Sequence, residues 1–265
     1  MTVCLAAICT HTNNQEVVIA ASDCMLTYAD LIEFEPPQSK ILYLNNKTLI
    51  LYGGDTTDHV SIWRSAFQGK GKNTDSMTTA QIADAYALEF RNFRAKRAEM
   101  QVLTPLGLTL KSYAAKRHQM SDYQLSELDR KLQESTRLLE VIIAGVDQTG
   151  AHIFTIVDPG VPACHDAFAF CAIGTGAYHA RSQYMFLNYT KVWSWNDCVY
   201  ATYAAKRRAE TAPGVGRETV IVVVGGYETP IVVNNSEMVK LKTVYDEMAN
   251  ENDASFKQAL QKLQN

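Results

Sequence analysis

The feature that most constrains this chain is an apolar stretch that begins almost at its first residue. Residues 3–9 read VCLAAIC, a run of small, β-branched and aliphatic side chains directly after Met1 and Thr2. Chain termini are usually polar and frayed, so this run predicts a buried strand that ties the N-terminus into the core. Any chemistry carried by the first residues is then held inside a folded domain.

The second residue is a threonine, which is small enough for ordinary aminopeptidases to remove the initiator methionine before it. The mature chain would then begin with a hydroxyl and a free α-amine on the same residue. An α-amine titrates near neutrality, with a pKa of about 8, and it can accept the proton of the neighbouring hydroxyl. Because many proteins begin Met-Thr, the dipeptide alone does not establish a nucleophile.

Composition excludes several classes of function. The chain has 265 residues, of which 47% are hydrophobic and 20% charged, as in an ordinary globular protein with a substantial core. Its formal net charge of −3 gives no reason to expect nucleic acid or an anionic membrane as a partner. No apolar run approaches the roughly 20 residues of a membrane span, and the N-terminus lacks the features of a signal peptide. The six cysteines show no metal-ligand spacing and are expected to be buried thiols in a reducing compartment, so we expect a cytoplasmic protein. The sequence indicates neither a metal nor an organic cofactor.

The order of patterns along the chain predicts an α+β fold. Strand patterns that form two predicted hairpins occupy much of the chain up to residue 52. Further strand patterns follow at 140–157, 167–173 and 219–226. Helical patterns lie between these groups, and Thr78 with Gln81 predicts a capping box at the start of one helix. Hairpins that alternate with paired helices predict a four-layer αββα sandwich, in which two antiparallel sheets each have a helical layer outside. We expect a single domain over residues 1–265, with a lengthened helical segment at about 78–139 and a peripheral C-terminal helix at about 236–263.

Several polar residues and glycines stand at the ends of predicted strands. Asp23 follows an apolar run, Lys40 opens the next strand, and Gly53-Gly54 closes the strand after it. Each has a simpler interpretation: Asp23 as a turn residue, Lys40 as a solvated side chain and Gly53-Gly54 as a turn. Thr175, which precedes a predicted helix, is explained better as an N-cap that incidentally faces the site. These positions therefore carry information about function only when they are taken together.

Taken together, they resemble a proteasome β-type subunit, which is an N-terminal-nucleophile hydrolase. The landmarks that carry the resemblance are a first strand that starts at Thr2, Ala20-Ala21-Ser22-Asp23, Lys40-Ile41, Tyr52-Gly53-Gly54-Asp55 before a helix, and Ile173-Gly174-Thr175-Gly176 before another. The resemblance covers about the first 70 residues closely and residues 138–226 recognisably. The extended N-terminal helix typical of α-type proteasome subunits is absent, which favours the catalytic type or its bacterial relatives.

The resemblance implies a catalytic role for four of these residues. Thr2 would be the nucleophile and its α-amine the proton acceptor, with Lys40 beside the hydroxyl as a second cation. Asp23 would pair with Lys40 and hold it charged and oriented. The backbone N–H of Gly54 would form the oxyanion hole, because a glycine lets the scissile carbonyl approach the chain closely.

The resemblance also implies a substrate site. An extended peptide would add as a strand between the segments near Thr27 and Gly53-Gly54. Tyr52 would border the pocket for the residue before the cut.

Some positions depart from the family pattern. Thr175 stands where the family usually has a serine, which replaces one hydroxyl by another. Glu210 would replace an aspartate of the same supporting cluster, whereas Pro213 stands near a usual serine and supplies no hydroxyl. The stretch from 88 to 139 is longer than usual, and activation would require only the removal of Met1.

The resemblance therefore implies a threonine-type endopeptidase that cleaves peptide bonds through an acyl-enzyme on Thr2. Its substrates would be peptides or unfolded proteins, its assembly a ring or helical array of like subunits, and an ATP-dependent unfoldase a further partner. One alternative is an amidase of the same class that acts on a small-molecule amide. Another is a structural subunit that keeps the fold and has lost the chemistry.

Overall fold

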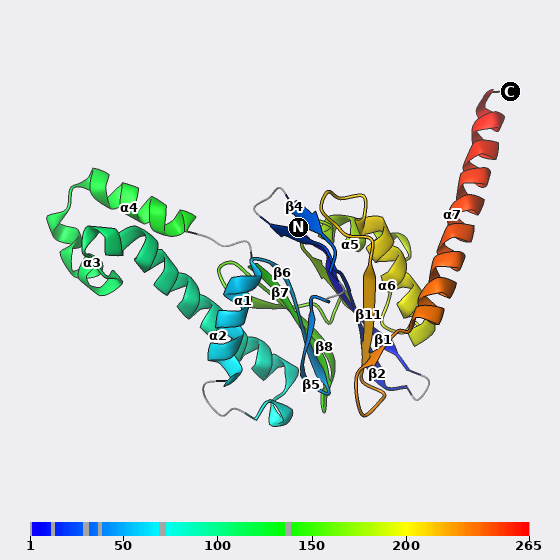
Figure 1. Ribbon diagram of the computed structural model, residues 1–265, viewed down its shortest axis with the longest axis horizontal. Helices are drawn as coiled ribbons and strands as arrows, with labels where there is room; N and C mark the ends of the chain where they lie inside the picture. Colours follow the sequence, from blue (N-terminus) through cyan, green and yellow to red (C-terminus); the bar gives the residue numbers. More distant parts are fainter. Residues whose placement is uncertain are drawn as a thin grey trace.

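The computed structural model describes residues 2–11, 14–28, 32–36, 39–68, 73–135 and 139–264. Its centre is a pair of five-stranded sheets, and all their strand pairs are antiparallel. Helices lie on the outer faces of both sheets (Figure 1). The predicted α+β class with two antiparallel sheets is therefore confirmed. Within the described ranges, no helix is both long and apolar enough to cross a bilayer.

The first sheet contains the N-terminal strand next to one edge, in the order β10-β1-β2-β11-β12. Its strands are β1 (Cys4–Thr10), β2 (Glu16–Asp23), β10 (Phe170–Ile173), β11 (Thr219–Val224) and β12 (Ile231–Val232). Almost every residue of β1 and β2 is buried, because one face of the sheet meets the second sheet and the other meets helices. Burial on both faces explains why these strands read as continuous apolar runs instead of alternating ones.

The second sheet has the order β5-β6-β7-β8-β9. Its strands are β5 (Ile41–Asn45), β6 (Thr48–Gly54), β7 (Leu139–Asp147), β8 (Gly150–Val157) and β9 (Val161–Cys164). A separate two-stranded ribbon connects the two sheets along the chain, formed by β3 (Leu26–Tyr28) and β4 (Ile32–Phe34).

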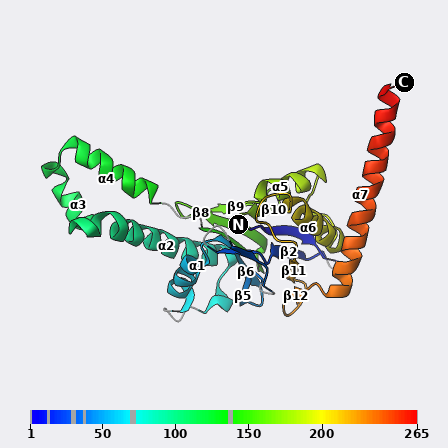
Figure 2. The same cartoon turned by 45° about the horizontal axis from the view of Figure 1, so that its top comes forward.

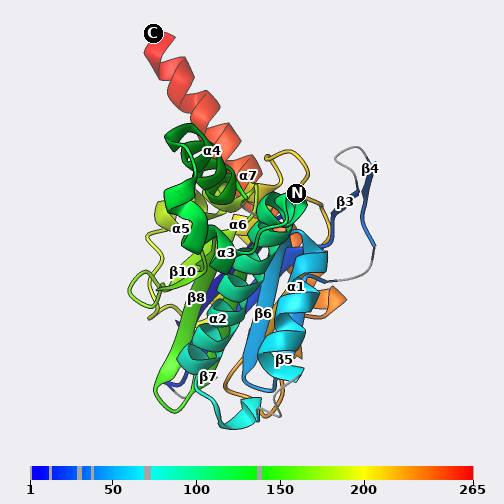
Figure 3. The same ribbon diagram turned by 90° about the vertical axis from the view of Figure 1, so that its left-hand side faces the viewer.

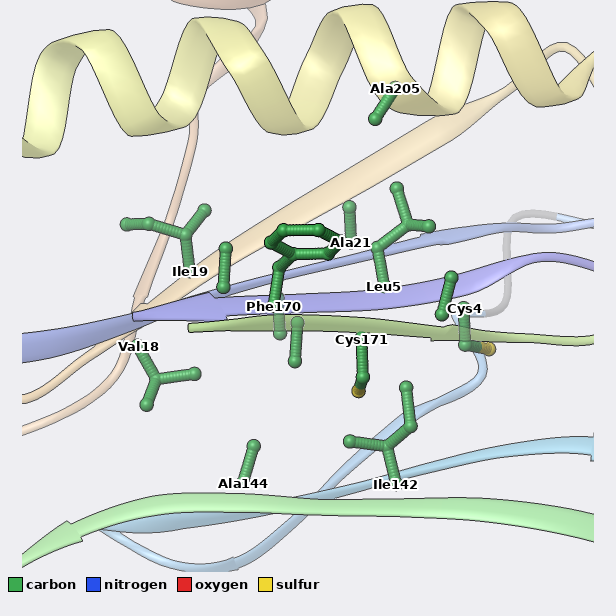
Figure 4. Packing of buried hydrophobic residues seen from close by; sticks show 14 of the residues in the cluster. Cys4, Leu5, Val18, Ile19, Ala21, Ile142, Ala144, Phe170, Cys171 and Ala205 are labelled. Carbon is green, nitrogen blue, oxygen red and sulfur yellow. The ribbon is translucent and has the colours of Figure 1, made fainter. Parts of the chain in front are cut away.

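Two helical layers complete the sandwich. Helices α5 (Ala177–Phe186) and α6 (Trp195–Ala209) pack on the first sheet, and α1 (Thr56–Trp63) and α2 (Thr79–Ala98) pack on the second (Figure 3). In Figure 4, Leu5 of β1 lies on the side of Ala205 of α6, while Cys171 lies on the side of Ile142 of the second sheet. The core therefore continues from α6 through the first sheet to the inner face of the second.

A helical arm leaves the body beyond the end of α2 (Figures 1 and 2). It contains α3 (Leu110–Lys116) and α4 (Asp122–Glu134). Short helical turns complete the described chain: η1 (Arg64–Gln68), η2 (Thr74–Ser76), η3 (Glu99–Leu103), η4 (Thr104–Leu106) and η5 (Arg117–Gln119). On the opposite side of the body, α7 (Asn235–Gln264) contacts α6 and then extends away from it.

The expected helix boundaries agree with the structure in most places. Thr78 and Gln81 form the predicted capping box at the start of α2, and the predicted C-terminal helix at about 236–263 corresponds to α7. The predicted helical segment at about 78–139 is too long at its end. Its last described helix ends at Glu134, and Leu139 already belongs to β7.

Removal of a buried side chain between the sheets should destabilise the whole sandwich. Ile142 is fully buried and pairs with Leu51 across β6 and β7. We expect Ile142→Ala to lower the free energy of unfolding by about 2–5 kcal/mol, because it leaves a cavity in a close-packed core. Val232→Ala, on an exposed part of the edge strand β12, should change it by less than about 0.5 kcal/mol. Urea unfolding of both variants measures the difference, and equal effects would contradict the assigned core.

Candidate active site around Thr2

Thr2 lies where three strand ends of the first sheet meet. Cys4, at the start of β1, pairs with Ser22 near the end of β2 and with Ile173 at the end of β10. This antiparallel register places Asp23 and the loop after Ile173 on either side of Thr2. Although Thr2 is the second residue of the chain, its exposed fraction is only 3%. From Thr2 onward, the predicted burial of the first residues is confirmed.

Thr2, Asp23 and Lys40 form one buried hydrogen-bonded cluster. Lys40 Nζ donates to Thr2 Oγ1 over 2.5 Å and to Asp23 Oδ1 over 2.8 Å. Thr2 Oγ1 in turn donates to the same carboxylate oxygen over 2.6 Å. Asp23 is fully buried and Lys40 is 4% exposed, so little water screens these charges. The sequence predicted this trio, and the structure brings its members into direct contact.

The loop after β10 holds the backbone of Thr2. The N–H of Thr2 donates to Thr175 Oγ1 over 3.2 Å, and the carbonyl of Thr2 accepts from Thr175 Oγ1 and from the N–H of Gly176. The N-cap of α5 is Gly176 and not Thr175, so the alternative interpretation of Thr175 as an N-cap is wrong. The hydroxyl of Thr175 contacts the nucleophile candidate directly.

Two glycines make room for Thr2. A Cβ atom added to Gly53 would lie 2.7 Å from Thr2 Cγ2, and one added to Gly174 would overlap the Thr2 carbonyl. Gly54 is the exposed last residue of β6 and has a φ of 89°, a conformation that glycine adopts without strain. Its role as an oxyanion donor stays a prediction, whereas the close approach of Gly53 to Thr2 is a feature of the fold.

Glu210 does not contact Thr2 within the described residues. Its carboxylate accepts from Lys206 Nζ over 2.7 Å and forms an ion pair with Arg207 Nη1 over 2.9 Å. Glu210 is linked to the site through Lys206. Lys206 Nζ donates to the carbonyl of Gly216, and the N–H of Gly216 donates to Asp23 Oδ2 over 3.0 Å. Burial lowers the pKa of Lys206, and its hydrogen bond to the Glu210 carboxylate opposes this shift.

Sequence reasoning missed three residues that support the site: Lys206, Gly216 and Glu140. Glu140 pairs with Gly53 across β6 and β7, and its Oε2 accepts from the N–H of Gly174 over 2.5 Å. Lys206 carried a weak signal, because it is a lysine among alanines on a helix with a glutamate four residues later. No local pattern marked Glu140 or Gly216.

The predicted substrate residues lie near the end of β6 and in β3. The ring of Tyr52 stacks on His59 of α1 with centroids 4.4 Å apart, and it packs against the core between the second sheet and α1 and α2. Its proposed border with a substrate pocket stays a prediction. Thr27 belongs to β3 and pairs with Glu33, and its side chain lies outside the described part of the structure.

The cysteines near the site are poor competitors for the role of nucleophile. Cys4 is fully buried, and burial raises the pKa of its thiol far above the usual range, so the reactive thiolate is disfavoured. Five of the six cysteines are buried as expected, but Cys164 is exposed, which corrects the expectation for that residue. Among the described residues, no group of three or more histidine, cysteine or acidic side chains is arranged to hold a metal ion.

Comparison with known proteins gives no assignment: no protein-family model matches the sequence, and no curated protein matches it significantly. Arguments about function therefore depend on the geometry described above.

The contact between Gly53 and Thr2 can be tested by a double-mutant cycle. We expect Gly53→Ala to destabilise the protein by about 1–3 kcal/mol, because its new Cβ is forced against Thr2 Cγ2 in a packed site. Thr2→Ser removes that methyl group and should restore most of the loss in the double variant. Urea unfolding of the four proteins measures the coupling energy, and strictly additive effects would contradict the contact.

His59 should make the protein sensitive to acid. Within the described residues its Nε2 has no hydrogen-bond partner, and burial lowers its pKa to about 4. Because the unfolded chain takes up a proton near pH 6.5 and the folded chain does not, stability is lost as pH falls from 6.5 towards 4, by roughly 3 kcal/mol in total. His59→Phe keeps a ring against Tyr52 and should reduce this loss between pH 7 and pH 4.5. The exposed His179 is the control: the acid sensitivity of His179→Gln should equal that of the wild type.

Proposed function

We propose that the protein is an N-terminal-threonine peptidase related to proteasome β-type subunits. The observation that carries the proposal is the 2.5 Å contact of Lys40 Nζ with Thr2 Oγ1 in a buried cluster completed by Asp23. A hydroxyl becomes a nucleophile when a cation stabilises its alkoxide and a base accepts its proton. The two-sheet sandwich with outer helices supports the same class of hydrolase, which the proposal names as its fold family.

The first step of the proposed reaction begins after Met1 is removed. The freed α-amine of Thr2 accepts the hydroxyl proton, and Oγ1 attacks the carbonyl carbon of the peptide bond. Lys40 stabilises the developing negative charge on Oγ1, and Asp23 keeps both groups aligned. Thr175 Oγ1, 3.2 Å from the Thr2 nitrogen, orients the amine.

The second step releases the products. The tetrahedral intermediate, held by the N–H of Gly54, collapses to an ester on Thr2 as the α-ammonium gives its proton to the departing amine. Water then attacks the ester with the α-amine as base, which releases the carboxylic acid and regenerates Thr2. The substrate would lie as an extended strand between Thr27 and Gly53, with Tyr52 beside its specificity pocket.

The proposal includes assembly of like subunits into a ring or open array in the cytoplasm, with an ATP-dependent unfoldase as partner. One feature of the surface supports subunit contacts. Helix α5 exposes large apolar side chains, among them Tyr178 at 83% and Phe186 at 78%, and exposed apolar surface of this kind is typical of interaction sites.

The decisive experiment measures the intact mass of the protein before and after treatment with a peptide epoxyketone, which reacts with an N-terminal threonine. We expect the loss of Met1 and one adduct that maps to Thr2. A chain that keeps Met1 and takes up no adduct would contradict the proposal and favour a structural subunit. An adduct without hydrolysis of any peptide would favour the small-molecule amidase.

Substitutions at the site test the mechanism. Thr2→Ala and Lys40→Ala should each lower kcat for fluorogenic peptides by at least about 1000-fold, because each removes a group that acts on the reacting oxygen. Thr2→Ser keeps the hydroxyl and should retain measurable activity. Lys47→Ala, in the exposed turn between β5 and β6, is the matched control and should leave kcat unchanged. Full activity of both alanine variants at Thr2 and Lys40 would show that the mechanism is wrong.

A further inference from the structure

Lys206 on α6 is a fully buried lysine whose ammonium group has three acceptors. Its Nζ donates to Glu210 Oε1 over 2.7 Å, to the carbonyl of Gly216 over 2.8 Å and to the carbonyl of Arg217 over 2.7 Å. These three acceptors satisfy all three protons of the ammonium group. Desolvation of a buried charge costs free energy. In return the ammonium group supplies hydrogen-bond donors to two loop carbonyls and one carboxylate, which an apolar side chain would not provide.

The loop that Lys206 holds is the loop that contacts Asp23. Gly216 accepts from Lys206 through its carbonyl and donates through its N–H to Asp23 Oδ2 over 3.0 Å. The other oxygen, Oδ1, accepts from Thr2, Lys40 and the N–H of Val3. Among the described contacts, Gly216 is thus the donor to Oδ2, while Oδ1 binds Thr2 and Lys40.

The rest of the loop leaves Gly216 little freedom. Ala212 and Val215 are buried in the core, and the N–H of Glu218 donates to Glu35 Oε1 over 2.8 Å. A Cβ atom on Gly216 would overlap that same carboxylate oxygen of Glu35. The carbonyls of Gly216 and Arg217 therefore face Lys206 in a loop that is fixed on both sides.

We propose that Lys206 is a positioning residue, which tethers the 216–217 loop so that the N–H of Gly216 fixes the carboxylate of Asp23 for its work with Thr2 and Lys40. This inference rests on the proposed function, because the carboxylate is positioned for that reaction. It goes beyond it in assigning a role to a residue that has no described contact with Thr2. Glu210 shares in the tether as the countercharge of Lys206.

The test compares Lys206→Met with a control variant in which another basic helix residue that forms an ion pair is also replaced by methionine. In Lys206→Met the two loop carbonyls lose their donor, while Glu210 keeps Arg207 as an ionic partner. We expect kcat for peptide hydrolysis to fall about 10- to 100-fold with KM changed less than about 3-fold, since alignment of the reacting groups is lost and substrate contacts are kept. Arg94→Met breaks the ion pair between Arg94 of α2 and Asp158 after β8, whose side chains are 28% and 25% exposed. It should leave kcat unchanged even if it lowers the melting temperature.

Hydrogen exchange gives a readout that does not depend on activity. The amide of Gly216 should exchange at least about 10-fold faster in Lys206→Met than in the wild type, and at the wild-type rate in Arg94→Met. If Lys206→Met does not fold, Lys206→Leu replaces it, because leucine also leaves the two loop carbonyls without an N–H donor. An unchanged kcat and an unchanged exchange rate in the folded Lys206 variant would overturn the inference.

The outcomes separate this inference from the proposed function. If the wild type takes no adduct on Thr2 and hydrolyses no peptide, the proposed function fails and the positioning role fails with it. If the wild type is active and the Lys206 variant has the wild-type kcat, only the positioning role is wrong. Glu210→Gln, which keeps an oxygen acceptor for Lys206, should lower kcat by less than about 3-fold, and a larger loss than in Lys206→Met would assign the effect to the ion pair instead of the loop.

Discussion

The site depends on the hydrogen bonds that the buried carboxylate of Asp23 accepts. The carboxylate accepts hydrogen bonds from Thr2, Val3, Lys40 and Gly216. These donors come from the residues just before β1, the residue just before β5 and the loop before β11. A carboxylate without water is stable only when such donors surround it. Its burial therefore requires that three distant parts of the chain converge, which is the arrangement that the two-sheet sandwich provides.

Much of this arrangement could be predicted from the sequence, because it follows from strand ends. Thr2, Asp23 and Lys40 each stand next to an apolar run. The antiparallel hairpin of β1 and β2 brings Thr2 and Asp23 together, and Lys40 comes from just before β5 in the facing sheet. The two sheets were predictable for the same reason. The short strand β9 was not predicted, and α3 was not separated from the rest of the predicted helical segment at about 78–139. The residues of both are largely exposed and carry little hydrophobic periodicity.

The supporting residues could not be predicted because their partners are backbone groups far away in the sequence. Lys206 binds carbonyls 10 and 11 residues further along, and Glu140 binds an N–H 34 residues away. Propensity and periodicity describe what a residue does to its own helix or strand, and neither records which loop its side chain reaches. Glu210 illustrates the difference: its involvement was predicted from position, but its actual partners, Lys206 and Arg207, became evident only from the fold.

The anchoring of Thr2 by both of its backbone groups has a consequence for the balance between stability and rate. A free chain end is normally the most mobile part of a protein, and its immobilisation reduces conformational entropy. Here that loss occurs during folding, when the N–H and the carbonyl of Thr2 bind the loop after β10. Under the proposed mechanism, the nucleophile and its base are already aligned when each substrate binds, so they react at a high effective molarity. The entropy cost of aligning them is met once, during folding, and lowers the stability of the fold instead of the rate of each turnover.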